Sequence, residues 1–136
     1  MAKRGIDDAT GFAAVRAVLN ETTAPEAAEA SPAGARDTLA TAVRYLLQLL
    51  EQKAPGHTVE VRVPPFGAVQ VVEGPRHTRG TPPNVIETDA STWVALAAGR
   101  LTWPEAVDLA RVSASGTRAT LEGLVPVLPH SFDLGE

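Results

Sequence analysis

A change in the spacing of apolar residues, close to the middle of the chain, limits the possible folds more than any other feature of the sequence. Between residues 36 and 53, apolar side chains recur at intervals of about 3.6 residues, which is typical of an amphipathic helix. The members of this stripe are Leu39, Val43, Leu46, Leu47 and Leu50. Pro55 and Gly56 are typical of a helix end, and from residue 58 to 63 valines alternate with polar residues, as in a half-buried strand. The chain therefore combines a long helix with a strand that follows it directly.

Similar patterns predict further elements on both sides of this pair. Apolar spacing indicates helices at 10–20 and 89–98. Valine-rich or alternating segments indicate strands at 68–73, 85–88 and 112–115, and the first of these should form a hairpin with the strand before it. The intervening polar segments contain proline and glycine, which are typical of loops.

Capping residues predict where several helices begin. Thr102 is followed by Pro104 and Glu105, a spacing typical of a capped first turn, and the helix should run to about residue 110. Thr117 is expected to cap a last helix, which would carry Leu121, Leu124 and Leu128. The acidic residues interpreted as helix caps rather than as acid–base pairs are Asp7, Asp8 and Asp89.

Charge and composition exclude several classes of protein. The 136 residues fit one domain, and 16 acidic residues outnumber 12 scattered basic ones, so no basic face for nucleic acid is expected. The absence of cysteine excludes disulfides and thiolate chemistry. No apolar run approaches the roughly 20 residues of a membrane span, and no signal peptide pattern is visible, so a cytoplasmic location is expected. Only 4% of residues are aromatic, which leaves room for a cavity in an aliphatic core.

The residues that carry a family resemblance lie mainly in the second half of the chain. They are Val85-Ile86-Glu87-Thr88-Asp89, Trp93, Leu96, Gly99-Arg100-Leu101, Ala106 and Val112-Ser113-Ala114-Ser115-Gly116. Their order and spacing resemble the sterol carrier protein 2-like domain over residues 36–128. The loop 76–84 is similar to that of an actinobacterial branch of sterol-carrier-family proteins.

This resemblance implies an α+β fold with about five mostly antiparallel strands and helices packed on one face. It implies a division into an N-terminal helix and linker at 1–34, packed on or preceding the domain, a domain at 35–128, and a tail at 129–136. It also implies an apolar tunnel between sheet and helices, with the C-terminal helix at its mouth. The chain ends in Leu134-Gly135-Glu136, so a peroxisomal address of the Ser-Lys-Leu type is absent.

We therefore expect a non-catalytic carrier of a lipid, sterol or other apolar small molecule. The expected lining residues are Val59, Val61, Val69, Val71, Ile86, Trp93, Leu96 and Leu121. The alternative is a ligand-free interaction domain, as a monomer or a dimer, in which these side chains simply fill the core. No cofactor or metal is expected, because the three histidines have no zinc-motif spacing and no catalytic or nucleotide-binding fingerprint occurs.

The sequence leaves open the role of one polar loop, residues 76–84. Arg76, His77, Arg79 and Asn84 group cationic and amide donors, and Arg79 could hold a ligand carboxylate. Alternatively, the loop is structural and Arg79 pairs with Glu87 or Asp89. A small enzyme that uses this loop is a third possibility, although the sequence supplies no metal ligands for one.

Overall fold

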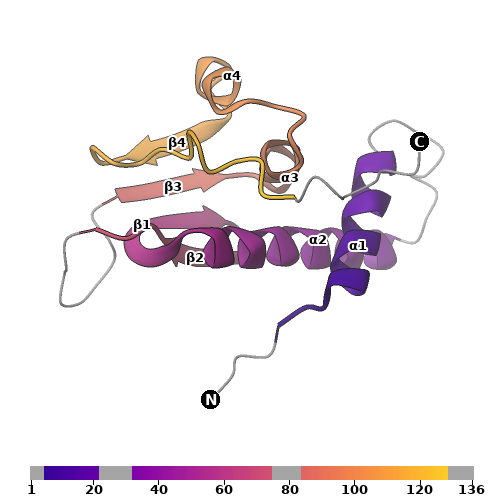
Figure 1. Cartoon of the computed structure of the whole chain (residues 1–136). Helices are drawn as coiled ribbons and strands as arrows, with labels where there is room; N and C mark the ends of the chain where they lie inside the picture. Colours follow the sequence, from indigo (N-terminus) through magenta and orange to yellow (C-terminus); the bar gives the residue numbers. More distant parts are fainter. Residues whose placement is uncertain (1–4, 22–31, 75–83, 129–136) are drawn as a thin grey trace.

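The structure is a computed structural model that describes residues 5–21, 32–74 and 84–128 (Figure 1). Its elements, in chain order, are α1 (Asp8–Glu21), α2 (Pro32–Lys53), β1 (Pro55–Val63), β2 (Gly67–Val71), β3 (Asn84–Thr88), α3 (Ala90–Ala98), α4 (Trp103–Asp108) and β4 (Val112–Ser115). The α+β class is confirmed. The expected count of about five strands is not, because the described residues form a four-stranded sheet.

The sheet has the order β2-β1-β3-β4 and is mixed. The two outer pairs are antiparallel, whereas β1 and β3 run parallel at its centre, with Val59 beside Asn84 and Val61 beside Ile86. Strand β2 ends beside the first half of β1, and β3 runs in the same direction as β1 on its other side. The carboxyl ends of β1 and β3 therefore lie at the same edge of the sheet.

The core forms where β1 and α2 each bury one face. The valines of β1 at 59, 61 and 63 are at most 1% exposed, while Glu60 and Arg62 lie on the opposite face and form an ion pair of 3.3 Å. Helix α2 packs on β1 and β2 and also contacts α3. Its predicted stripe is confirmed by the burial of Val43, Leu46, Leu47 and Leu50.

Helix α1 packs on α2 through a close approach at Gly11. A Cβ on Gly11 would lie 2.2 Å from Cγ of Tyr45, so only a residue without a side chain allows this separation. Phe12 meets the same ring edge-on, with centroids 5.7 Å apart. The Tyr45 hydroxyl donates a hydrogen bond of 2.5 Å to Oδ1 of Asp8. Tyr45 therefore links the two helices through both its ring and its hydroxyl.

The stability of this helix contact should depend on pH in the alkaline range. Burial, together with the hydrogen bond to Asp8 and its negative charge, raises the pKa of Tyr45 above its ordinary value of 10.0. A raised pKa means that the stabilisation is complete below pH 10 and is lost as the pH rises through the folded-state pKa. Tyr45→Phe should cost about 1 kcal/mol near neutral pH, the usual contribution of one hydrogen bond, and this difference should shrink above pH 10.

Denaturant unfolding of both proteins between pH 8 and 12 measures the difference. Tyr45 is the chain's one tyrosine, so its ultraviolet absorbance reports its ionisation directly. Ionisation in the folded protein at the ordinary pKa of 10.0 would contradict the buried contact.

The prediction of a last helix from Thr117 is wrong. Residues 116–128 form turns and irregular backbone rather than a helix. Gly116 and Gly123 adopt positive φ angles of 110° and 83°, and Pro126 provides no backbone N–H for a helical hydrogen bond. Leu121 is nevertheless fully buried. The other boundaries shift by a few residues: α1 and α2 begin earlier than predicted, and β2 ends at Val71.

Candidate functional site

The residues predicted to line a tunnel lie together in one apolar layer. Val69 is partly buried and packs against the others, which are at most 1% exposed. The seven buried residues are Val59, Val61, Val71, Ile86, Trp93, Leu96 and Leu121. The layer therefore joins side chains from β1, β2, β3, α3 and the segment 116–128. Their burial is what both a core and a ligand site require, so their role as the lining of a ligand site stays a prediction.

Trp93 anchors the helical side of this layer. Its side chain is 0% exposed, and its indole Nε1 donates a hydrogen bond of 3.2 Å to the carbonyl of Val43 in α2. The start of α3 is fixed by Asp89, whose carboxylate accepts from the backbone N–H of Thr92 at 2.8 Å. The predicted role of Asp89 as a helix cap is confirmed. Because α3 is fixed at its start, Trp93 is held in one orientation against α2.

A segment without helix or strand covers one side of the layer. We call residues 116–128 the cover segment; in Figure 1 it is the yellow trace that runs past β4 and ends beside α3. The backbone N–H groups of Val127 and Leu128 donate to the carbonyl of Ala97 at 2.9 and 3.4 Å. Its fully buried residue is Leu121. The partly buried apolar residues of the segment are Ala119, Leu124, Val125, Val127 and Leu128.

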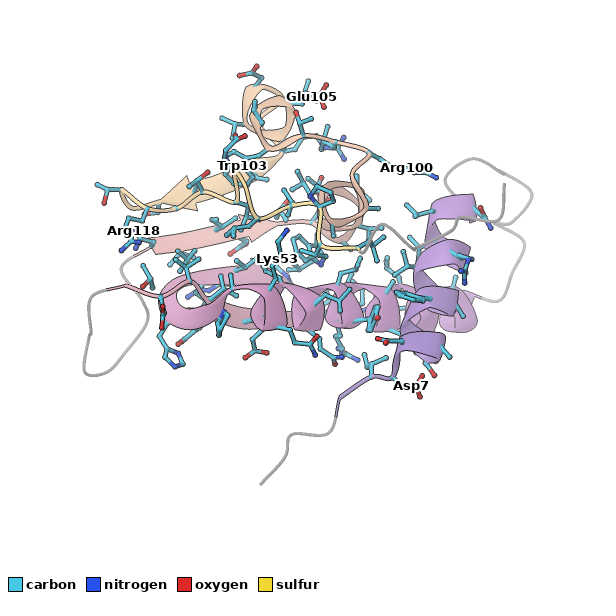
Figure 2. All side chains as sticks on the ribbon, viewed as in Figure 1. Asp7, Lys53, Arg100, Trp103, Glu105 and Arg118 are labelled. Carbon is cyan, nitrogen blue, oxygen red and sulfur yellow. The ribbon has the colours of Figure 1, made fainter. Side chains whose placement is uncertain are left out.

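Lys53, the last residue of α2, holds the cover segment from the other side. Its ammonium group donates to the carbonyl oxygens of Leu124 and Pro126 at 3.0 and 3.1 Å. Figure 2 shows the side chain rising from α2 toward the segment. Within the described residues, Lys53 forms no ion pair with a carboxylate. Lys53 is thus a cation whose partners are two backbone carbonyls of the cover.

The near end of the cover is fixed through Asn84, which the sequence groups with a polar loop that is either an anion site or structural. The side chain of Asn84 is 4% exposed, and its amide donates to the carbonyl of Thr58 at 3.0 Å. Its oxygen accepts from the backbone N–H of Arg118 at 2.9 Å. Asn84 therefore joins β1, β3 and the cover. Arg76, His77 and Arg79 lie outside the described residues, so the anion site stays a prediction.

The role of Lys53 could not be predicted from the sequence. A lysine in the last turn of a helix is a weak signal, because it commonly interacts with the helix's own terminal carbonyls. Its acceptors belong to residues about 70 positions later in the chain, in a segment without a regular pattern. Only the folded structure brings these groups together.

Two surface grooves lie away from the apolar layer, and none of the eight predicted lining residues borders either of them. The first, of about 390 Å³, follows the ends of β1 and β3, and the second, of about 310 Å³, lies around Gln48. The described part of the chain holds no cluster of histidine, cysteine and acidic residues suited to a metal. None of its helices is long and apolar enough to cross a bilayer.

Comparison with known proteins agrees with this architecture. The family model described as "Bacterial SCP ortholog" matches residues 35–127, which include the whole sheet, α3, α4 and most of both α2 and the cover segment. Helix α1 precedes the matched region. No curated protein matches the chain. The chain belongs to the family of bacterial SCP orthologues, which are sterol carrier protein-like domains.

Proposed function

We propose that this protein is a non-catalytic carrier that holds a lipid, sterol or similar apolar molecule between its sheet and the cover segment. Membership of the sterol carrier protein-like family supports this function. The apolar layer supports it as well, because contact with its side chains would favour an apolar ligand by about 25 cal/mol per Å² of buried apolar surface, before the costs of binding.

The observation that carries the proposal is the position of Leu121. This side chain is 0% exposed, yet its backbone belongs to a segment with no helix or strand. Only Val127 and Leu128 join this segment to another described element through backbone–backbone hydrogen bonds, both to Ala97. A segment with so few such bonds to the rest of the fold opens at a lower free-energy cost than a core helix or strand. If the cover moves outward, Leu121 leaves the layer and its place becomes available to a ligand. Burial of a leucine side chain contributes only about 1.5–3 kcal/mol, which a larger apolar ligand can exceed.

Lys53 would control this opening. Its two hydrogen bonds close the cover over the layer, and both must break before the segment can move. Since Lys53 is exposed, water replaces its acceptors when the cover opens, which keeps the cost low. The proposal thus assigns Leu121 as the side chain that the ligand replaces and Lys53 as the latch.

Intrinsic fluorescence tests the proposal. In a Trp103→Phe background, Trp93 is the one tryptophan, and it lies inside the proposed site. Titration with methyl oleate should change its emission in a saturable way. Leu121→Ala should bind methyl oleate several-fold and up to about tenfold more tightly, since the ligand no longer displaces a leucine and about 1.4 kcal/mol corresponds to tenfold.

Leu109→Ala is the matched control, because Leu109 is 60% exposed and should not alter the affinity. Native mass spectrometry of freshly purified protein provides an independent test for a retained lipid. Absence of both saturable binding and retained lipid would reject the carrier. It would favour the alternative, an interaction domain that uses the exposed Val107 and Leu109, and light scattering would then test for a dimer.

A further inference from the structure

The groove of about 390 Å³ lies outside the proposed carrier site and has a charged lining. It occupies the sheet edge where the parallel strands β1 and β3 end and β4 begins. Glu87 and Ser113 are direct partners across β3 and β4, so they point to the same outer face of the sheet. The residues that line the groove are Pro64, Glu87, Thr88, Asp89, Ala110, Arg111, Val112 and Ser113.

The backbone around Arg111 is held in place by the end of α4. Ala110 has a positive φ of 58°, and the N–H groups of Ala110 and Arg111 donate to the carbonyls of Val107 and Ala106. This is the Schellman pattern of a helix end, in which glycine is the usual left-handed residue. The hydroxyl of Thr88 also donates to the carbonyl of Arg111 at 2.7 Å. Arg111 is therefore fixed from both α4 and β3.

The guanidinium of Arg111 is oriented as well. Its Nε donates a hydrogen bond of 3.0 Å to Oγ1 of Thr92, a residue that is 0% exposed. This contact fixes the plane of the guanidinium, whose two terminal nitrogens form no hydrogen bond with a described residue. A guanidinium held by Nε can bind a carboxylate through its terminal N–H groups.

The two acidic residues of the groove differ in what they already bind. Burial raises the pKa of Asp89, but hydrogen bonds from Thr92 and Ser91, together with the positive charge of Arg111, outweigh burial and lower it, so Asp89 is a carboxylate committed to the start of α3. Glu87 is exposed, and its side chain has no hydrogen bond or ion pair within the described residues. The groove therefore offers two groups to a ligand. One is the guanidinium of Arg111, whose charge acts on Asp89 but whose terminal nitrogens form no hydrogen bond with a described residue, and the other is the carboxylate of Glu87, which has no ion pair there.

We propose that this groove binds a small zwitterion of the α-amino acid type, with its carboxylate on Arg111 and its ammonium group on Glu87. A multiply charged anion such as phosphate fits less well, because the two carboxylates of the lining repel it. A simple cation meets the positive charge of Arg111. A ligand with both charges can bind the terminal nitrogens of Arg111 and the carboxylate of Glu87 at once. The proposal does not depend on the carrier function, since none of the apolar lining residues borders the groove.

Titration of the ¹⁵N-labelled full chain with L-alanine tests the proposal by NMR. Saturable shifts are expected at the amides of residues 87–89 and 110–113. Propionate and isopropylamine each carry only one of the two charges, and inorganic phosphate tests a plain anion site. Each of these three should bind at least about tenfold more weakly than L-alanine, which corresponds to the loss of one charge-assisted hydrogen bond. No saturable shift with L-alanine, or equal binding of propionate or phosphate, would overturn the proposal.

Two substitutions separate the charges. Glu87→Gln changes no described contact, so the fold should persist while L-alanine loses its advantage over propionate. Arg111→Gln should abolish carboxylate binding, although it also removes the contact with Thr92. The matched controls are Glu122→Gln and Arg100→Gln, because both residues lie outside the groove lining. If Glu87→Gln left the affinity for L-alanine unchanged, the zwitterion site would be rejected even if Arg111→Gln proved unstable.

Discussion

Trp93→Ala is expected to lower the free energy of unfolding by about 3–5 kcal/mol, the usual loss for a buried aromatic residue. The side chain is 0% exposed, so its removal leaves a cavity between α3 and α2. The substitution also removes the indole N–H that binds the carbonyl of Val43. A domain of this kind is typically stable by about 5–15 kcal/mol, so the variant should be near the limit of folding. Urea denaturation followed by circular dichroism measures the loss.

Trp93→Phe is the informative control for this substitution. Phenylalanine keeps an aromatic ring in α3 but cannot donate to Val43, so its loss should be clearly smaller than that of alanine. A loss from Trp93→Ala below about 0.5 kcal/mol, the level of surface substitutions, would mean that α3 does not pack on α2 as described.

The regular elements could be predicted because their signals are local. A strand with one buried face must alternate, and the alternation from residue 58 to 63 identified β1 with its buried valines. The capping spacing identified the start of α4, where Thr102 and Glu105 bind each other's backbone N–H groups at 3.2 and 2.9 Å. In both cases, the residues that determine the structure lie within a few positions of one another.

The cover segment shows where such local reasoning fails. Thr117 and the following leucines satisfy a helical pattern, but two glycines with positive φ and contacts with α3 determine the actual path. The burial of Leu121 was still predicted correctly, because an apolar side chain reaches the core whichever backbone carries it. Hydrophobic pattern therefore predicted which residue is buried better than which backbone conformation buries it.

The two functional proposals depend on contacts that the sequence could not reveal. Lys53 meets Leu124 and Pro126, and Arg111 meets Thr92, and each pair is brought together only by the tertiary fold. The predicted lining residues were apolar residues of strands and helices, which a core and a ligand site share. For this reason the sequence identified the apolar layer but not its latch or the charged groove.

The β1–β2 hairpin contains a glycine, Gly56, that lies very close to the backbone of the opposite strand end. The pairing of β1 with β2 moves from Pro55 opposite Val71 to Val59 opposite the same residue, so β1 bulges between them. Gly56 has a φ of 150° inside this bulge. The backbone of Val72 closes it, because its carbonyl accepts from Thr58 at 3.1 Å and its N–H donates to Ala54 at 2.7 Å. The bulge thus depends on close backbone packing at Gly56.

Gly56→Ala is therefore expected to cost about 3–5 kcal/mol. A Cβ at this position would lie 2.0 Å from the carbonyl oxygen of Val72, and that backbone cannot move without losing its hydrogen bonds. The strained φ costs about 1–3 kcal/mol, and each lost hydrogen bond adds about 1 kcal/mol. Gly67→Ala in β2 is the matched control, since its nearest neighbour would be the flexible Leu47 side chain at 3.4 Å, and it should cost under about 1 kcal/mol. Equal losses for the two variants in thermal and urea unfolding would mean that the β1 bulge is not formed as described.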